Sequence, residues 1–236
     1  MDYKVSEDSV GDWLRNIVSL RKSIDLFADL VTDPADTRIL MEHELATKPI
    51  RAPVPIISRP FEEAAFYDPL RAAIEWPFEH PCRSRYSNGS FGVWYGARTL
   101  ETSVHETVYH FRRDTLASAV AAKSRAPIYQ ERRVHRVRCS AMLVDLRTLC
   151  AGEPRLLDPD DYSFCQGLGA QLRAAALPGI QSISARDPGG EVVGVFRQET
   201  LSDPRDVCYL TYMLHPRTGR VEIEREPGRV ALTIPS

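Results

Sequence analysis

Apolar and polar positions along the chain follow two periods, one typical of helices and one typical of strands. Within 9–31, nine apolar residues recur at helical spacing, which predicts an amphipathic helix. Asp33-Pro34 is expected to end it, because the residue before a proline avoids the helical region. A second helix is expected over 35–47. Four prolines within 48–60 argue against a helix there and indicate an extended connector.

This pattern divides the chain into a helical N-terminal extension, 1–50, and a main domain, 51–236. In the main domain helices are mixed with strands that look antiparallel, which is typical of the α+β class. The expected helices are 61–76 (interrupted at Pro69), about 99–113, 115–124 and 162–177. The expected strands are 91–95, 130–139 continuing into 142–146, 179–186, 191–196, and a hairpin of 207–214 and 220–225.

Composition narrows the class of protein. The chain has 236 residues and a formal net charge of −2, so it lacks the bulk positive charge of nucleic-acid-binding proteins. No apolar run approaches the roughly 18–20 residues that span a bilayer, and the acidic N-terminus is unlike a signal peptide. The five cysteines contain no CxxC pair, which indicates reduced thiols. We therefore expect a cytoplasmic protein without direct nucleic-acid or membrane contact.

The stretch 83–110 carries the candidate chemistry. It reads as a basic turn, a short strand, a loop and a helix, and it places Arg85, Tyr95 and Glu106 on three consecutive elements that can converge. A guanidinium group, an aromatic ring and a carboxylate around one cleft suit an anionic ligand that has a flat, positively polarised ring.

Two other patterns partly match cofactor-binding motifs, but neither predicts a bound cofactor. His105-Glu106 and His110 nearly match the HExxH zinc motif. Their i, i+5 spacing sets the histidines about 140° apart on a helix, so no metal site is expected. Gly167-Leu-Gly169 begins a partial dinucleotide-binding fingerprint, but it lies inside an expected helix and no strand precedes it. This pattern favours close helix packing.

Taken singly, each candidate residue also has an ordinary structural role. Ser103-Val-His-Glu106 matches the S-x-x-E capping box, so Glu106 would serve as a helix cap. Arg85 would be a surface arginine, Tyr95 a half-buried strand residue and Ser184 a strand serine.

As a set, however, these residues resemble the RES domain, a family named for its Arg, Glu and Ser. The resemblance covers about 55–215 and rests on the order and spacing of several short motifs. They are Ser84-Arg85-Tyr86, Val93-Trp-Tyr95-Gly-Ala97, Thr102-Ser-Val-His-Glu106, Ser182-Ile-Ser184-Ala-Arg186, Gly189-Gly190 and Val192-Val-Gly-Val-Phe196.

The chain departs from the family pattern at two places, and three alternatives stay open. Ile183 stands where the family usually has proline, and Tyr86-Ser-Asn replaces the more common Trp-Asn. The site serine is therefore Ser184 or Ser182. The alternatives to the other two residues are Arg83 for Arg85 and Glu101 for Glu106.

The resemblance implies a bacterial toxin of a type II toxin–antitoxin pair, with an ADP-ribosyltransferase-like mixed sheet. It implies NAD⁺ as the substrate, no metal, and an Xre-like helix-turn-helix antitoxin that covers the active cleft. Glu106 would stabilise the oxocarbenium-like transition state. Arg85 would grip the pyrophosphate, Tyr95 would stack on nicotinamide, and Ser184 would hydrogen-bond the carboxamide or the ribose.

Two alternatives to NAD⁺ depletion remain. The chain could transfer ADP-ribose to a target protein, with 1–50 presenting a docking surface for that protein. From a different class, it could be a non-catalytic module that binds a nucleotide or a partner helix, and Ile183 is the best support for that hypothesis.

Overall fold

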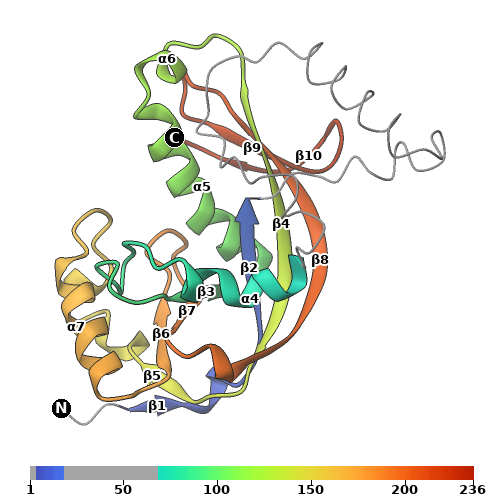
Figure 1. The fold of residues 1–236 in the computed structure, drawn as a ribbon. Coiled ribbons are helices and arrows are strands. Elements are labelled where there is room, and N and C mark those ends of the chain that lie inside the picture. Colours follow the sequence, from blue (N-terminus) through green and yellow to red (C-terminus); the bar gives the residue numbers. More distant parts are fainter. Residues whose placement is uncertain (1–3, 19–68) are drawn as a thin grey trace, which may run out of the picture.

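Strands from both described segments form one mixed sheet in the computed structural model, which describes residues 4–18 and 69–236 (Figure 1). Within these residues the strands are β1 (Val5–Ser6), β2 (Gly11–Val18), β3 (Trp94–Ala97), β4 (Ile128–Cys139), β5 (Leu143–Asp145), β6 (Gly179–Ile183), β7 (Glu191–Val195), β8 (Leu201–Leu214), β9 (Val221–Glu226) and β10 (Arg229–Ile234). Their order across the sheet is β1-β5-β6-β7-β3-β2-β4-β8-β9-β10. Only β5 and β6 are parallel neighbours.

Four α-helices of the described residues accompany this sheet, together with short 3₁₀ turns, so the α+β class is confirmed. The helices are α4 (Pro69–Glu79), α5 (Leu100–Leu116), α6 (Ala119–Ala122) and α7 (Ser163–Ala174). The 3₁₀ turns are η1 (Glu7–Ser9), η2 (Arg147–Leu149), η3 (Pro154–Leu156) and η4 (Gln198–Thr200). No described helix combines the length and apolarity needed to cross a bilayer.

The helix expected over 9–31 is wrong for its first part. Strand β2 lies inside the sheet, between β3 and β4, and pairs with β4 along its whole length. Trp13 packs with the cluster around Trp94, whereas Leu14 packs with the cluster under α5. Neighbouring residues therefore point to opposite faces, both of which are covered. A strand buried on both faces lacks strict alternation, so its apolar spacing resembles that of a helix.

The other expectations for 1–68 lie mostly outside the described residues. These are the remainder of the first helix, the helix 35–47, the connector 48–60, the boundary at residue 50 and the start of the helix 61–76. The described helix α4 begins at Pro69 and includes Pro77.

In the main domain, most elements appear where the pattern predicted them. Three details differ. Residues 142–146 do not continue β4, because β5 pairs with β1 and β6 instead. The helix expected over 115–124 is reduced to the four residues of α6. Strand β10, which pairs with β9, was not predicted.

Three apolar clusters form the core and hold the helices on the sheet. α5 covers the cluster of β4, β8, β9 and β10, which includes Val108, Phe111 and Tyr212. Residues of α4, β2, β3 and β7 form the second cluster, around Trp13 and Trp94. α7 packs on β5, β6 and the Tyr86 segment in the third. α5 thus packs on β4, β8, β9 and β10, whereas α4 and α7 pack on clusters that contain residues of β3, β5, β6 and β7.

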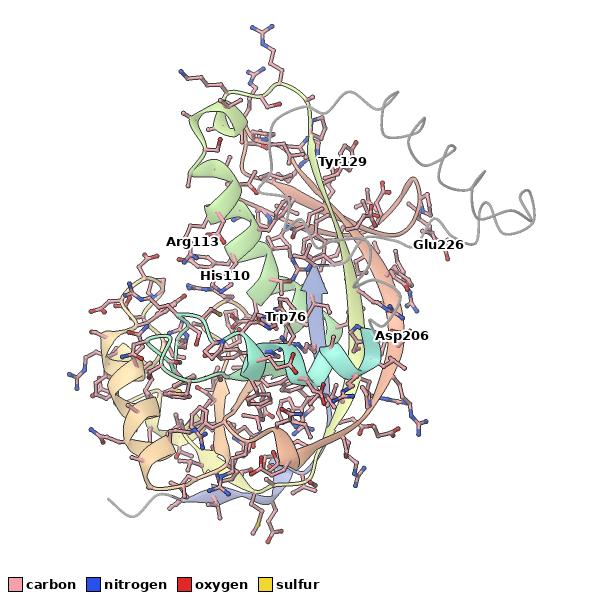
Figure 2. The ribbon with its side chains drawn as sticks, in the orientation of Figure 1. Trp76, His110, Arg113, Tyr129, Asp206 and Glu226 are labelled. Carbon is pink, nitrogen blue, oxygen red and sulfur yellow. The ribbon has the colours of Figure 1, made fainter. Side chains whose placement is uncertain are left out.

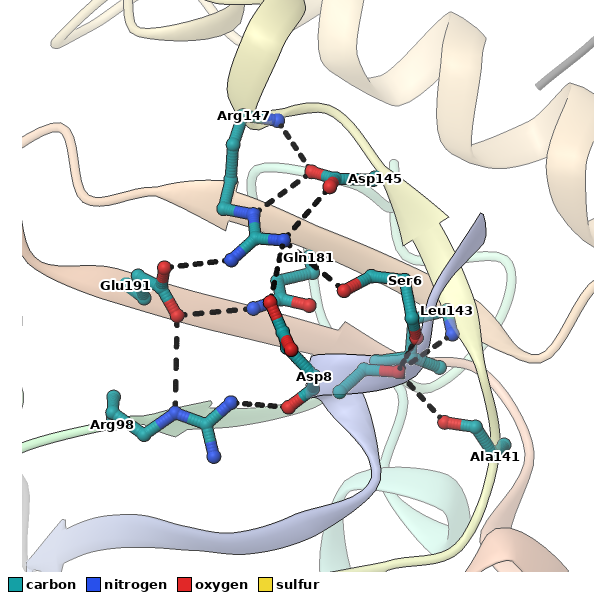
Figure 3. Close-up of polar contacts among 10 residues, drawn as sticks. Ser6, Asp8, Arg98, Ala141, Leu143, Asp145, Arg147, Gln181 and Glu191 are labelled. Carbon is teal, nitrogen blue, oxygen red and sulfur yellow. Dashed lines mark hydrogen bonds and ion pairs between the residues drawn. The ribbon is translucent and has the colours of Figure 1, made fainter. Parts of the chain in front are cut away.

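An ion network joins the N-terminal strand to the central sheet (Figure 3). The Arg147 guanidinium binds Asp145 at 2.8 Å, Glu191 at 2.7 Å and Asp8 at 3.3 Å. It also donates to Ser6 Oγ at 3.1 Å. These partners lie in or next to β1, β5 and β7, so one side chain connects three strands.

His135 is a buried titratable residue of β4. Its side chain is 0% exposed, and burial lowers its pKa to about 4. Asp206 Oδ1, 3.0 Å from Nδ1, opposes this shift only in part. The imidazole is therefore neutral in the folded protein at neutral pH.

Candidate active site

Glu106 lies in the interior of α5. The helix is capped by Thr99, whose Oγ1 accepts a hydrogen bond from the Thr102 N–H at 3.1 Å. The expected capping box at Ser103 is therefore wrong. Ser103 is buried within the helix, and its Oγ donates to the Leu100 carbonyl at 2.7 Å. The Glu106 carboxylate consequently has no capping role and is available for other contacts.

Ser184, in the turn after β6, binds the Glu106 carboxylate directly. Its Oγ donates to Glu106 Oε1 at 2.6 Å. The same Oγ accepts from the backbone N–H groups of Arg186 and Asp187, each at 3.0 Å. A hydroxyl has one proton and two lone pairs, so these bonds use its full capacity. Ser184 is 4% exposed, and its main effect is to orient Glu106.

The turn that carries Ser184 is hydrogen-bonded to the first turn of α5. Asp187 Oδ2 accepts a hydrogen bond from Thr102 Oγ1 at 2.6 Å, and Thr102 precedes Glu106 by one helical turn. Gly190 closes the turn through a 2.7 Å bond from the Ser184 N–H. A Cβ at Gly190 would lie 2.5 Å from Asp187 Oδ2 and 2.6 Å from Thr102 Oγ1. Glycine is therefore required for the turn and α5 to approach this closely.

Arg85 lies in the segment before β3 and holds the loop 156–162. Its Nη1 donates to the carbonyls of Leu156 at 3.2 Å and Asp158 at 2.9 Å. Its guanidinium carbon lies 4.5 Å from the centre of the Tyr162 ring, a cation–π contact. Among the described residues, no carboxylate forms an ion pair with Arg85. The Arg85 charge nevertheless helps to lower the pKa of the Asp158 carboxyl in the same loop, after the hydrogen bonds from the backbone N–H groups of Asp160 and Asp161.

Tyr95, on β3, supports the segment that carries Arg85. Its Oη accepts from the Tyr86 N–H at 3.1 Å and donates to Ser84 Oγ at 3.0 Å. Burial raises the pKa of Tyr95, so the phenol stays protonated. The ring packs against the apolar cluster of α7 and β5–β7. Both capacities of the hydroxyl are thus used to hold the backbone next to Arg85.

The three alternative residues lie in different surroundings. Arg83 is exposed, and its backbone pairs with Asn88. Glu101 is exposed in the first turn of α5. Ser182 is 1% exposed, and its Oγ lies 3.6 Å from Cys150 Sγ in the core. Of the candidate acids and serines, the structure brings Glu106 and Ser184 together.

Three further residues surround the site and were assigned no role from sequence. The Arg186 guanidinium lies 3.4 Å from the centre of the Tyr109 ring. It also donates to the Pro159 carbonyl, and to Tyr162 Oη at 3.2 Å. Tyr109 Oη bonds the same carbonyl at 3.1 Å and Asp160 Oδ1 at 2.6 Å. Tyr109 and Arg186 therefore hold the loop 156–162, which includes Tyr162, against α5.

The sequence contains a weak signal for two of these residues, Tyr109 and Arg186. Tyr109 follows Glu106 by three positions, so the two side chains share a helix face. Arg186 follows Ser184 by two positions within the motif that carries the serine. Helical spacing and motif proximity together identify them, although neither shows the contact with the loop.

Positive charge collects around one turn of α5. Desolvation lowers the pKa of His110 most, the charges of Arg113, Arg186 and Arg85 lower it further, and the Asp114 charge opposes the shift. Figure 2 shows His110 and Arg113 on the side of α5 that faces away from β4 and β8. Arg85 and Arg186 thus act electrostatically on the same residue, one turn beyond Glu106.

Gly169 explains how α7 packs beside this site. A Cβ at Gly169 would lie 2.0 Å from the Tyr86 carbonyl oxygen, whereas a Cβ at Gly167 would meet nothing within 4 Å. The expected packing role is therefore confirmed for Gly169, and Gly167 faces open space. The close approach places α7 directly against the backbone that follows Arg85.

Other features of the described surface do not include the candidate residues. A hollow of about 410 Å³ is lined by Phe78, Arg173 and 196–199, and one of about 260 Å³ by Arg125, 215–218 and Arg220. The described residues also contain no group of three or more histidine, cysteine or acidic side chains placed to hold a metal. The candidate active site is therefore defined by the polar contacts of Arg85, Glu106 and Ser184, and not by a hollow or a metal-binding cluster.

Comparison with known proteins identifies the family. The RES domain model matches residues 56–215, which is more than half of the chain. The chain belongs to the RES domain family. This match includes Arg85, Tyr95, Glu106 and Ser184.

Among solved structures, this RES domain is similar to a chain of the Mycobacterium tuberculosis MbcT-MbcA toxin-antitoxin complex. The identity is 18% and the TM-score is 0.39, and the similarity covers 64% of this chain and 80% of that chain. No curated protein matches the chain.

Proposed function

We propose that this RES domain cleaves the nicotinamide–ribose bond of NAD⁺, with Glu106 facing the ribose. The observation that carries the proposal is the 2.6 Å bond from Ser184 Oγ to Glu106 Oε1. This bond joins the two residues that the resemblance assigns as the glutamate and the serine of the RES motif, although 78 positions separate them in the chain. The guanidinium groups of Arg85 and Arg186, neither of which forms an ion pair with a described carboxylate, favour an anionic substrate.

The residue types suit the reaction. Breaking the N-glycosidic bond leaves positive charge on the ribose, which a fixed carboxylate stabilises. Nicotinamide leaves as a neutral base, so the reaction requires no general acid. Ser184 would act by holding Glu106 in one orientation, because its hydroxyl has no remaining hydrogen-bond capacity. This assignment differs from a direct serine contact with the ribose or the carboxamide.

Arg85 and Tyr95 would act together. Arg85 would contribute positive charge for the pyrophosphate while its Nη1 holds the loop 156–162. The Tyr95 hydroxyl is committed to Ser84 and Tyr86, so Tyr95 would fix the Arg85 segment. Stacking of the Tyr95 ring on nicotinamide stays a prediction.

The test is nicotinamide release from NAD⁺ by the purified chain, with Glu106→Gln as the inactive variant. Glu101→Gln is the matched control, because Glu101 lies in the same helix and is exposed. We expect release that Glu106→Gln abolishes and Glu101→Gln preserves. No release by the folded wild-type chain with water, phosphate or protein as acceptor would favour the non-catalytic binding module.

Family membership also supports a biological role as the toxin of a type II toxin–antitoxin pair. In that role the protein would be cytoplasmic, and an Xre-like helix-turn-helix antitoxin would cover the site. Co-expression with such a protein is expected to restore growth and to inhibit nicotinamide release. Growth arrest by both wild type and Glu106→Gln would argue against this toxic mechanism.

Transfer of ADP-ribose to a protein is the alternative within the same chemistry. Labelled adenylate followed into protein or into free product separates transfer from hydrolysis or phosphorolysis. Deleting residues 1–50 is an unsuitable test for a docking surface, because the deletion removes β2 from the middle of the sheet.

A further inference from the structure

Arg186 is a charged residue without a carboxylate partner in the described part of the chain. Several other arginines have acids beside them, for example Arg147 with Asp145 and Glu191, whereas the buried Arg132 is held by Asn16 and Gln130. Arg186 instead contacts a carbonyl, a hydroxyl and an aromatic ring. Its Nε is buried and has no hydrogen-bond partner among the described residues. A guanidinium group in this state retains its full charge and unused donors.

The position of Arg186 relative to the site is fixed at both ends. Its backbone N–H binds Ser184 Oγ, the atom that orients Glu106. Its guanidinium group lies over Tyr109 and is held by the loop 156–162. Two residues of extended chain span at most about 7 Å. The backbone of Arg186 is therefore within that distance of Ser184.

Arg85 is held by the same loop in a similar way. Its Nη1 is used by two carbonyls of the loop, and its charge also has no acid partner among the described residues. Both arginines contact Tyr162: the Arg85 guanidinium lies 4.5 Å from the centre of its ring, and Arg186 donates to its hydroxyl at 3.2 Å. The loop 156–162 therefore holds two guanidinium groups that form no ion pair with a described carboxylate, and Arg186 is linked to Glu106 through Ser184.

We propose that Arg186 binds the diphosphate of a dinucleotide, with Arg85 as the second charge and the loop 156–162 positioning both groups. The inference rests on the proposed function and specifies its substrate class. The nicotinamide ribose of NAD⁺ is bonded directly to the diphosphate, so a ribose at Glu106 places phosphate oxygens near residue 186. Arginine matches phosphate oxygens through paired charged hydrogen bonds.

The experiment measures binding of ADP and of adenosine by calorimetry to wild type, Arg186→Met, Arg186→Lys and Arg173→Met. Methionine retains an apolar chain against Tyr109 without the charge. Arg173 is an exposed arginine of α7 without an ion pair among the described residues, and it serves as the control. We expect Arg186→Met to weaken ADP binding about tenfold to a hundredfold. Arg186→Lys should restore part of this loss, and Arg173→Met should have no effect.

Adenosine separates ligand binding from a structural role, because it lacks the diphosphate. The proposal predicts that Arg186→Met leaves adenosine binding unchanged. Equal weakening of adenosine and ADP, unchanged ADP binding, or no ADP binding by folded wild type would overturn it. Selective loss of ADP binding in a chain that releases no nicotinamide would support this inference and refute the proposed reaction.

Discussion

Replacing Gly169 with alanine should damage the fold and the site together, because α7 has no room for a side chain at this position. The added Cβ would lie 2.0 Å from the Tyr86 carbonyl oxygen and 2.9 Å from its carbon. Ordinary contact begins near 3.4 Å, so the helix or the Tyr86 backbone must move by more than an ångström. Tyr86 is 1% exposed and its N–H is bonded to Tyr95, so the backbone cannot yield easily.

The size of the effect follows from two opposing contributions. Overpacking a well-ordered core costs about 1–3 kcal/mol, and a helical glycine replaced by alanine gains up to about 1 kcal/mol. Gly167→Ala should have the gain in helix propensity without the overpacking cost, because nothing lies within 4 Å of its Cβ. The two variants should therefore differ by about 1–3 kcal/mol in the free energy of unfolding, with Gly169→Ala the less stable.

Urea unfolding followed by circular dichroism measures this difference, with Gly167→Ala as the matched control on the same helix. The denaturation midpoint of Gly169→Ala should fall below that of wild type, and that of Gly167→Ala should equal or exceed it. Nicotinamide release should decrease in Gly169→Ala, because the shifted backbone carries Arg85. Equal midpoints for the two variants would refute the reasoning about close packing.

Three further outcomes are expected. Arg147→Ala should lower the free energy of unfolding by about 1–3 kcal/mol in urea titrations, because it removes charged hydrogen bonds to the half-buried Asp145 and Glu191. Arg155→Ala removes an exposed pair worth about 0–1 kcal/mol, and equal losses would contradict this. His135 has a folded-state pKa of about 4 and an unfolded-state pKa of about 6.5, so the unfolded chain binds the proton first as pH falls. The free energy of unfolding should therefore fall by about 2 kcal/mol between pH 7.5 and 5. Urea titrations at each pH should show a smaller fall for His135→Gln, and an equal fall would contradict the low folded-state pKa of His135. Ser184→Ala should reduce the rate constant of nicotinamide release about tenfold to a hundredfold with little change in KM, because Glu106 loses its orienting bond; a change confined to KM would point to a substrate contact instead.

The parts of the fold that depend on local pattern could be predicted. Helix α5 shows clear helical spacing and a capping threonine, and β7 and β9 are short runs bounded by turn residues. Strand β2 could not be predicted, because its partners β3 and β4 lie far along the chain and both of its faces are covered. Helical and buried-strand patterns are then alike, and only the pairing decides between them.

The residues of the candidate site that belong to sequence motifs could be predicted. Glu106 and Ser184 were named as candidates, but their direct bond depends on how the turn after β6 meets α5. Ser103 matched the capping-box pattern, but that prediction was wrong. Thr99, four residues earlier, caps the helix by accepting a hydrogen bond from the Thr102 N–H. The contacts of Arg85 with the loop 156–162 depend on tertiary packing, and no local pattern contains them.

The place of β2 in the sheet has a consequence for how the protein is made. β2 leaves the ribosome first among the central strands, but Gly11 pairs with Cys139, which is synthesised about 130 residues later. At about 5–20 residues per second this delay lasts roughly 6–25 s. For all of that time the pairing with β4 is incomplete, and for the first part β2 also lacks β3, whose Ala97 pairs with Leu14. Its polar residues Asp12, Arg15 and Asn16 help to keep the nascent segment soluble until β3 and β4 arrive. A recombinant fragment limited to residues 56–215 would lack β2 altogether, and it would expose the facing edges of β3 and β4 to aggregation.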